Sequence, residues 1–387
     1  MKRYARYVAL FAVLAMLVVA CGGSSSGDTT TTAAAETTTT AMAETTTTAA
    51  GDTTTTAMAM PEPIRACQVT DTGGIDDKSF NQTAWKGVTD AIDQGYATED
   101  SDYLESQADT DYAPNIQSWL DEGCDLIITV GFLLGDATAA AAEANPDQDF
   151  EIIDYAYDPS IPNIRGAVFG TTDAAFLAGY LAAGMTQTGT VATYGGIQIP
   201  CGVTCFMDGF VYGVRYYNQE KGTDVQVLGW NPEAQTGTFT GDFENADNGR
   251  NVTQSFVDEG ADVVLPVAGP VGVGTAALAQ EQGDVWVIGV DADWFVTLPE
   301  YSDIILTSVL KGLDVAVSST IKDVAEGTFE GGTRLFTIAE DGVGIGPINP
   351  DVPADLVTEV ETLKEGLKDG SIVACDQAEG ASDSCAG

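Results

Sequence analysis

The sequence predicts an α/β protein made of two doubly wound, parallel-sheet lobes joined by a hinge, and three observations support this fold class. Short runs rich in Val, Ile and Ala alternate with helix-like stretches from residue 64 to residue 375. The runs are apolar on both faces, which is typical of parallel sheets covered by helices on both sides. A folded region of this length usually divides into two domains.

The first lobe is predicted from one series of alternating elements. Its strand candidates are residues 66–70, 126–130, 151–153 and 164–169. Its helical patterns are residues 81–93, 115–122 and 137–144. Strands and helices that take turns in this way are joined by crossover connections, which gives a parallel sheet.

A second series begins after residue 171 and predicts the second lobe. Its strand candidates are residues 191–194, 225–228, 263–267, 285–290 and 304–308. Its helical patterns are residues 173–185, 206–220, 249–259 and 272–282.

The chain is then expected to cross between the lobes again, through a helix at 310–327 and a segment at 335–339. We therefore assign residues 64–171 plus about 309–333 to the N-terminal lobe. Residues 172–308 plus about 334–375 form the C-terminal lobe, and residues 376–387 a C-terminal tail. Such a hinged clamp would bind ligands beyond the carboxyl ends of its strands.

The N-terminus has the features of a bacterial export signal. Basic residues at positions 2, 3 and 6 precede an apolar run from Tyr7 to Ala20, and Cys21 follows at once. This junction resembles the bacterial lipoprotein box, so residues 1–20 are expected to be a lipoprotein signal peptide and Cys21 the lipidated residue. The alternative is an ordinary signal peptide with an incidental Cys.

Residues 21–63 are expected to form a disordered, Thr- and Ala-rich tether, because from Gly22 onward they contain no aromatic residue. No later stretch reaches the roughly 18 apolar residues that a membrane-spanning helix needs. We therefore expect an extracytoplasmic protein that is attached to the cell membrane through its lipid alone.

The charge and the composition exclude several classes of function. Acidic residues outnumber basic ones 58 to 15, and the formal net charge is −43. Nucleic-acid phosphates would repel such a polyanion, so no DNA or RNA partner is expected. The chain has no His, which excludes His-based triads and the usual zinc hydrolases. It also lacks a Gly-x-Ser-x-Gly elbow and a Gly-Lys pair for a phosphate-binding loop.

The cysteines other than Cys21 are disulfide candidates in an exported protein. Six cysteines allow fifteen pairings, and proximity favours three of them. These are Cys67 with Cys124, Cys201 with Cys205, and Cys375 with Cys385. A cysteine metal site is the weaker interpretation, because the chain has no Cys-x-x-Cys motif. We expect neither a metal nor a cofactor.

Carboxylates and aromatic rings follow the predicted strands repeatedly. Residues 70–81 form a Gly-rich turn that ends at a helix start, where Asp77 or Ser79 is able to cap the helix. The candidate ligand-binding residues near strand ends are Asp71, Phe80, Asn81, Asp154, Phe206, Gly269, Asp291 and Lys311. Carboxylates can accept two hydrogen bonds from a vicinal diol, and opposed rings can sandwich a flat base. Taken singly, each Asp is better explained as a helix cap or a solvated turn residue; taken together, as six strand ends that point into one cleft, they favour ligand binding.

The motifs resemble one family specifically. Residues 71–81, with Trp85 and Gly87 following, resemble the opening motif of the basic membrane protein family of ABC-transporter lipoproteins, which contains the PnrA-like purine nucleoside receptors. Later blocks at residues 176–183, 195–196, 209–214, 289–293 and 307–311 match in the same order.

The resemblance implies the type I periplasmic-binding-protein fold and a small-molecule ligand, in the first place a nucleoside. It implies that Phe80 and Phe206 stack on the base and that Asp154 meets the edge of the base. Asp71 and Asn81 would add polar contacts, and Asp291, Lys311 and the Gly269 backbone would hold the ribose. A monomer that serves an ABC permease and ATPase complex is expected. The loop 199–205, with two Cys and a Pro, departs from the family pattern.

Two other functions remain as alternatives. The first is a dinucleotide-binding enzyme, because Gly272-x-Gly274-x-x-Ala277 follows a strand and Asp291 follows the next one. Against this, Pro270 interrupts the tight turn. The second is a surface sensor that binds a ligand and signals to a partner instead of feeding a permease.

A glycosidase is a weaker interpretation than either. The carboxylate pair Asp291 and Asp293 could serve one in principle, but adjacent acids on one loop are more often structural or ligand-binding.

Overall fold

The computed structural model describes residues 61–374, which all fall within one compact unit. The expected signal peptide, Cys21, the tether up to residue 60, and Cys375 and Cys385 in the C-terminal region lie outside the described residues. Among residues 61–374, no helix is long and apolar enough to cross a bilayer.

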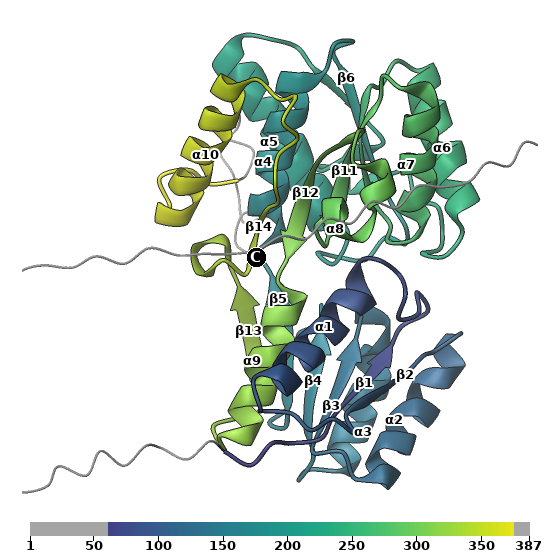
Figure 1. Ribbon diagram of the computed structural model, residues 1–387, viewed down its shortest axis with the longest axis vertical. Coiled ribbons are helices and arrows are strands. Elements are labelled where there is room, and N and C mark those ends of the chain that lie inside the picture. Colours follow the sequence, from purple (N-terminus) through teal and green to yellow (C-terminus); the bar gives the residue numbers. More distant parts are fainter. Residues whose placement is uncertain (1–60, 375–387) are drawn as a thin grey trace, which may run out of the picture. The chain divides into compact units, whose positions relative to one another are not determined.

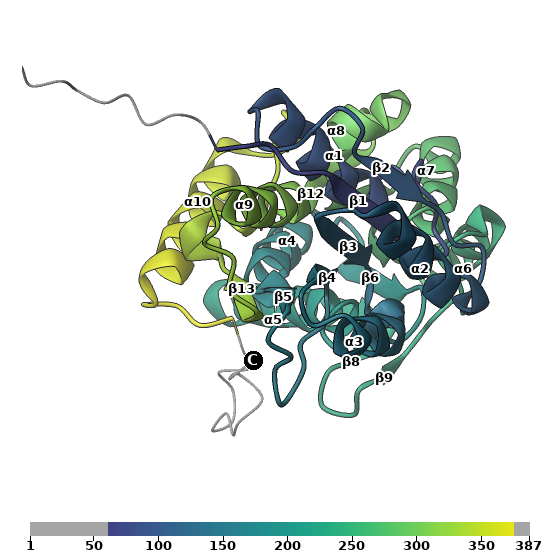
Figure 2. The same ribbon diagram turned by 90° about the horizontal axis from the view of Figure 1, so that it is seen from below.

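The first lobe is built around a mostly buried parallel sheet, whose strands lie in the order β13-β5-β4-β3-β1-β2. Its strands are β1 (Ala66–Thr70), β2 (Asp102–Leu104), β3 (Leu126–Val130), β4 (Asp149–Ile153), β5 (Ile164–Phe169) and β13 (Gly332–Phe336). Its helices are α1 (Phe80–Asp93), α2 (Tyr112–Glu122), α3 (Gly135–Ala144) and α9 (Leu313–Ala325), with the 3₁₀ turns η1 (Asp109–Asp111) and η2 (Phe132–Leu134). Helices α1 and α9 pack together on one face, while α2 and α3 cover the other (Figure 2).

The second lobe has a sheet in the order β14-β12-β11-β10-β6-β7, in which only β14 is antiparallel to its neighbour. Its strands are β6 (Thr190–Gly195), β7 (Gln226–Leu228), β10 (Val263–Val267), β11 (Trp286–Asp291), β12 (Ile305–Lys311) and β14 (Val343–Ile345). Its helices are α4 (Thr171–Met185), α5 (Thr204–Lys221), α6 (Ala246–Asp258), α7 (Val271–Gln282), α8 (Trp294–Thr297) and α10 (Ala354–Asp369). Figure 1 shows α4 and α5 on one side of this sheet and α6 and α7 on the other. A two-stranded ribbon of β8 (Trp230–Asn231) and β9 (Thr236–Gly237), and the 3₁₀ turns η3 (Pro299–Tyr301) and η4 (Ile338–Glu340), complete the lobe and its connections.

The two sheets repeat one strand order. In each lobe the first strand in the chain lies between the second and the third, and the fourth and fifth follow outward. The sixth strand of each sheet is added after the chain has returned from the other lobe. This is the doubly wound order in which ligands bind at the carboxyl ends of the strands, and it confirms the predicted fold class.

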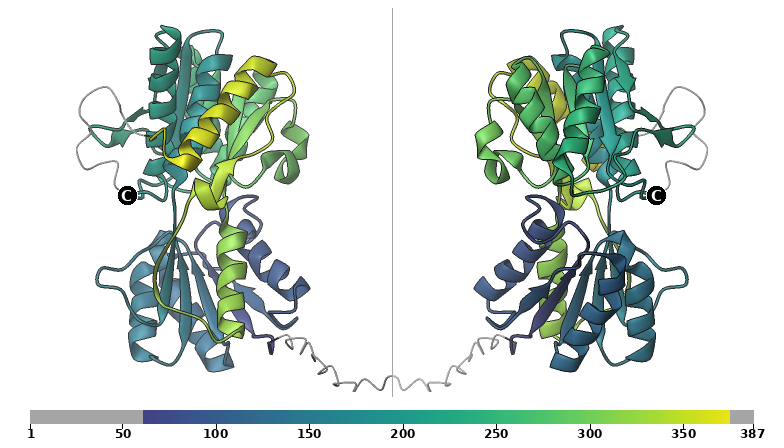
Figure 3. Two further views of the ribbon diagram at one scale, coloured as in Figure 1. Left: turned by 90° about the vertical axis from the view of Figure 1, so that its left-hand side faces the viewer. Right: turned by 90° about the vertical axis from the view of Figure 1, so that its right-hand side faces the viewer.

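Three crossovers connect the lobes and run side by side (Figure 3). The chain crosses at Gly170 between β5 and α4, at Gly312 between β12 and α9, and between β13 and β14. The amide of Gly170 donates to the Phe336 carbonyl at 2.9 Å, and the amide of Gly312 donates to the Gly342 carbonyl at 2.8 Å. Parallel crossovers tied by a few backbone hydrogen bonds are the construction expected of a hinge.

Two predicted boundaries need correction. Residues 309–311 were assigned to the N-terminal lobe, but β12 continues to Lys311 within the second sheet. Residues 334–336 were assigned to the C-terminal lobe, but they belong to β13 and pair with β5. The helix expected at 310–327 begins at Leu313 for the same reason, since the strand before it is longer than its apolar core suggested.

Both predicted disulfides within the described residues are present. Cys67 in β1 is joined to Cys124, just before β3, and both are buried. Cys201 is joined to Cys205, which lies in the first turn of α5. The Cys67 bond therefore fastens two neighbouring strands of the first sheet, while the Cys201 bond closes a short loop of the second lobe.

Candidate functional site

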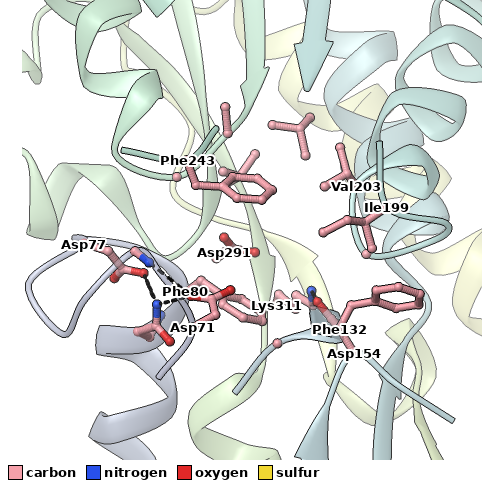
Figure 4. Close-up of a pocket in the computed structure, with 18 of the residues that line it drawn as sticks. Asp71, Asp77, Phe80, Phe132, Asp154, Ile199, Val203, Phe243, Asp291 and Lys311 are labelled. Carbon is pink, nitrogen blue, oxygen red and sulfur yellow. Dashed lines mark hydrogen bonds and ion pairs between the residues drawn. The ribbon is translucent and has the colours of Figure 1, made fainter. Parts of the chain in front are cut away.

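The site is a cavity at the carboxyl ends of both sheets, lined from both lobes (Figure 4). It contains about 600 Å³ of space, part of which is open to solvent. All eight residues that the sequence nominated lie in its wall: Asp71, Phe80, Asn81 and Asp154 from the first lobe, and Phe206, Gly269, Asp291 and Lys311 from the second.

Two of the carboxylates occupy equivalent positions in the two lobes. Asp154 follows β4 and Asp291 ends β11, and these are the fourth strands of their sheets. Both have left-handed backbones, with φ of 64° and 65°. Asp tolerates this conformation better than most residues. A sharp turn at each strand end thus gives both lobes a carboxylate in the cavity wall.

The turn before α1 joins the helix to the opposite lobe. One carboxylate oxygen of Asp77 accepts the amides of Ser79 (3.0 Å) and Gln82 (3.1 Å), and the other accepts the amide of Asn81 (2.7 Å). Asp77 therefore caps the helix, and its burial raises its pKa to about 7. The Ser79 hydroxyl does not cap the helix. It donates a hydrogen bond to Asp291 Oδ2 in the second lobe, at 2.8 Å.

Asn81 holds Asp71 in place beside the cavity. Its Nδ2 donates to Asp71 Oδ1 at 2.8 Å and to Asp77 Oδ2 at 3.2 Å, while its Oδ1 has no hydrogen-bond partner among the described residues. Gly131, at φ 121°, allows the close approach of Asp71, because a Cβ there would lie 2.7 Å from Asp71 Oδ2. The loss of hydration raises the pKa of Asp71 to about 6.

Among the described residues that line the cavity, Lys311 is the only one with a positively charged side chain. It is only 3% exposed, and its ammonium group forms an ion pair and hydrogen bond with Asp154 Oδ2. The nitrogen lies 5.0 Å from the ring centre of Phe80 and 5.6 Å from that of Phe206, distances suited to cation–π attraction. Burial raises the pKa values of Asp154 and Asp291, and the nearby Lys311 opposes this rise in both.

The aromatic rings of the cavity differ in their exposure. Phe206 is 1% exposed and belongs to the core of the second lobe as well as to the wall. Phe80 and Phe243 are half-buried and lie on opposite sides of the space, with Asp291 between them in the view of Figure 4. A ligand with a flat part between these two rings would therefore lie close to Asp291.

The sequence did not nominate Phe243, because no strand precedes it. Its position comes from tertiary contacts alongside the end of β6. Gly195 exchanges backbone hydrogen bonds with Thr238 and Thr240, and the Gly241 amide donates to the Gly196 carbonyl. Other lining residues that were not assigned to ligand binding are Gly73, Asp77, Gly131, Phe132, Ile199, Gly202, Val203, Val267, Ala268, Pro270 and Val290. Their only common signal in the sequence is that many follow strands β1, β3, β6 or β10.

The chemistry of the wall suits a neutral ligand that has both a flat apolar part and hydrogen-bond donors. Carboxylates and an amide oxygen offer acceptors, and aromatic rings offer apolar faces. Within residues 61–374, no group of three or more Cys, Asp or Glu side chains is placed to hold a metal ion.

Comparison with protein families identifies the chain. Residues 64–373 match the model of the Bmp family, described as ABC transporter substrate-binding protein PnrA-like. The chain belongs to this family. As a member, it is an ABC-transporter substrate-binding protein and not an enzyme, so the dinucleotide-dependent alternative is set aside.

Individual Bmp relatives cover most of the chain. An "ABC transporter nucleoside-binding protein BmpA" of Lactococcus lactis subsp. cremoris is 31% identical over 331 residues, which are 80% of this chain and 88% of the relative. A "CD4+ T-cell-stimulating antigen" of Listeria monocytogenes is 32% identical over 320 residues, 79% of this chain and 86% of the relative. "Basic membrane protein A" of Borreliella burgdorferi is 30% identical over 306 residues, with coverages of 78% and 85%.

Solved structures share the fold of this chain. An ABC transporter system solute-binding protein from Aeropyrum pernix K1 superposes with a TM-score of 0.70 at 28% identity, over 80% of this chain and 92% of that one. A solute-binding protein from Conexibacter woesei has a TM-score of 0.61 at 22% identity, over 79% and 97% of the two chains. The fold is thus that of type I periplasmic-binding proteins, as the sequence predicted.

Proposed function

We propose that this Bmp-family protein binds a purine nucleoside in the cavity between its lobes. It works as a monomeric, extracytoplasmic lipoprotein anchored through Cys21, and it delivers the nucleoside to the permease and ATPase of an ABC importer. The observation that carries the ligand class is the pair of half-buried rings, Phe80 and Phe243, which lie on opposite sides of the cavity with the Asp291 carboxylate beside the space between them. The nucleoside-binding relative from Lactococcus supports the same class.

The proposed binding mode assigns the base to the rings. Two opposed aromatic faces suit a purine, because stacking adds to the gain from apolar burial. We assign the second face to Phe243 rather than to Phe206, since Phe206 is nearly fully buried beside Lys311. Asp154 then supports the site through its ion pair with Lys311, and its remaining oxygen accepts a hydrogen bond from the edge of the base.

The ribose is assigned to the second lobe. Asp291 accepts hydrogen bonds from the two vicinal hydroxyls, while Lys311 and the backbone of Gly269 donate to ribose oxygens. Asp71 and Asn81 belong to the first lobe. Asp71 and the Oδ1 atom of Asn81, which has no hydrogen-bond partner among the described residues, accept hydrogen bonds from the nucleoside. Satisfying a buried, partnerless acceptor is a direct gain for a ligand that has donors.

Lipid anchoring and delivery rest on other observations. The N-terminal sequence ends its apolar run at Cys21, and a relative from Pyrococcus horikoshii that is 30% identical over 293 residues is named a lipoprotein. A relative named basic membrane protein A agrees with a membrane location. The family description itself places substrate-binding proteins of this type with ABC transporters.

The test is the thermal unfolding of the purified protein with inosine, guanosine or adenosine. A ligand that binds only the folded state at 100 times its Kd adds about 2.7 kcal/mol to the free energy of unfolding, which raises the melting temperature by several degrees. Phe80→Ala and Phe243→Ala should each remove most of this ligand-dependent rise.

Phe239→Ala is the matched control. Phe239 lies in the same segment as Phe243 but packs against Trp230, with ring centres 5.8 Å apart, and is not part of the cavity wall. It should lower the melting temperature without removing the response to nucleoside. No response of the unaltered protein to any of the three nucleosides would refute the proposed ligand class.

A further inference from the structure

The loop between β6 and α5 lines part of the cavity and is closed by a disulfide. Ile199, Gly202 and Val203 line the cavity, and the bond between Cys201 and Cys205 closes the loop around two of them. Cys205 lies in the first turn of α5. The bond therefore ties the loop, residues 199–205, to the helix that follows it.

This loop of the second lobe also meets the first lobe. A Cβ at Gly202 would lie 3.6 Å from Asp154 Oδ2, which is the oxygen that binds Lys311. The close approach places the loop against the ion pair at the point where the two lobes meet. Any displacement of the loop would change both the apolar wall and the surroundings of this ion pair.

Apart from the disulfide, local hydrogen bonds and the burial of Ile199 and Val203 hold the loop in its conformation. Cys201 has a left-handed backbone with φ of 56°, which is unfavourable for a residue other than Gly. Its amide donates to Thr204 Oγ1 at 3.1 Å, and the amides of Val203 and Thr204 donate to the Ile199 carbonyl at 3.1 and 3.2 Å. Val203, at the N-cap of α5, provides no side-chain cap. The disulfide adds a covalent constraint, between positions 201 and 205, to these interactions.

We propose that the Cys201–Cys205 disulfide is a positioning element of the ligand site, which holds Ile199 and Val203 against the ligand and so slows its release. The inference rests on the proposed function and deepens it. Opening the bond makes the wall mobile, and the ligand must then order it on binding, at a cost in affinity.

The two described disulfides differ in their accessibility. Cys201 is exposed, whereas Cys67 and Cys124 are 0% and 3% exposed. A dithiol such as dithiothreitol should therefore open the Cys201 bond first. The dithiol is oxidised to its own cyclic disulfide, and its two electrons and two protons yield the two cysteine thiols. Iodoacetamide labelling followed by peptide mass analysis establishes which thiols have formed.

The experiment measures inosine binding by calorimetry and by stopped flow, at a temperature where every form of the protein is folded. Three forms are compared: the oxidised protein, the protein selectively reduced and alkylated at Cys201 and Cys205, and the Cys201→Ser/Cys205→Ser variant. Opening the bond should raise Kd roughly tenfold, mainly through faster dissociation. Dithiothreitol should not change the Kd of the double variant further.

The outcomes separate the two proposals. Equal Kd and equal dissociation rates in the oxidised and opened forms overturn this inference alone, even if the opened forms melt at a lower temperature. A lower melting temperature without a change in Kd is what a purely structural disulfide would give. If the oxidised protein binds none of the three nucleosides, both the proposed function and this inference fail. If the double variant does not fold, the reduced and alkylated protein still decides the question.

Discussion

At the scale of single residues, the turn before α1 shows how two adjacent polar side chains divide their roles. The sequence left Asp77 and Ser79 as equal candidates for the helix cap. Asp77 accepts three backbone amides and caps α1, while Ser79 donates to Asp291, 212 residues further along the chain. Capping can be predicted from spacing because it is local. The partner of Ser79 could not be predicted, since it depends on how the two lobes meet.

A second buried carboxylate lies outside the cavity. Glu151 in β4 is fully buried, and its Oε1 accepts a hydrogen bond from Thr320 Oγ1 in α9 at 2.6 Å. Its Oε2 has no hydrogen-bond partner among the described residues. Burial raises the pKa of Glu151 to about 7, although Thr320 and the nearby Arg165 act in the opposite direction. The side chain is therefore protonated in the folded state over a pH range where it is charged in the unfolded chain.

This difference gives Glu151 a pH-dependent effect on stability. Between the unfolded pKa, near 4.5, and the folded pKa, about 7, the folded state binds the extra proton, so stability falls as pH rises through this window. Glu151→Gln removes the titration. It should reduce the loss of unfolding free energy between pH 5 and pH 8 by about 3 kcal/mol relative to the unaltered protein.

The measurement is urea denaturation of both proteins at pH 5 and pH 8. Asp71 and Asp77, whose pKa values are also raised, remain in both proteins, so their contributions cancel in the comparison. Parallel losses in the two proteins would mean that Glu151 does not titrate in this range.

At the scale of elements, the strands could be predicted better than the segments between them. Strands β1, β3, β5 and β10 have the bounds that the sequence indicated, because each is a short, mostly apolar run whose residues are nearly all buried. Strands β2 and β14 were missed, since each has three residues and some exposure. Helix α10 was also missed, although its buried residues recur at helical spacing.

The eight nominated site residues were found for a related reason. All eight lie at or just after the end of a strand or in the first turn of a helix, and in doubly wound sheets these positions converge. Phe243 was missed because it is carried by an irregular segment, and its place depends on backbone pairing beside Gly195 and Gly196. Sequence patterns therefore predict the part of a site that regular elements build, and they miss the part that loops build.

The Cys67–Cys124 disulfide gives a prediction about the first sheet. It joins β1 to the start of β3 and closes a loop with a sequence separation of 57 residues. The Cys67→Ala/Cys124→Ala variant should lose about 4 kcal/mol of unfolding free energy by the loop-entropy relation. Chemical denaturation under oxidising conditions measures this loss.

The Cys201→Ser/Cys205→Ser variant serves as the comparison. It opens a loop with a separation of only four residues, so the same relation gives a smaller loss, roughly 2 kcal/mol. A loss for the longer loop no greater than that for the shorter one would show that the Cys67 bond contributes little constraint to the unfolded chain.

At the scale of the whole molecule, the account depends on residues remote in sequence meeting at one place. Asp71 and Lys311 are far apart in the sequence, yet both line the same cavity because the two sheets have the same strand order and their carboxyl ends face each other. The lobed fold could be predicted from the alternation of strands and helices. The hinge boundaries could be predicted only approximately, because strands β12 and β13 extend past their apolar cores.

The family assignment and the lining of the cavity together support one central claim: a purine nucleoside binds between Phe80 and Phe243. A crystal structure of the protein with adenosine or inosine tests it most directly. The account predicts a base stacked between these two rings and a ribose whose vicinal hydroxyls lie within hydrogen-bond distance of Asp291. A nucleoside bound elsewhere on the protein, or a cavity that stays free of nucleoside at saturating concentration, would contradict it.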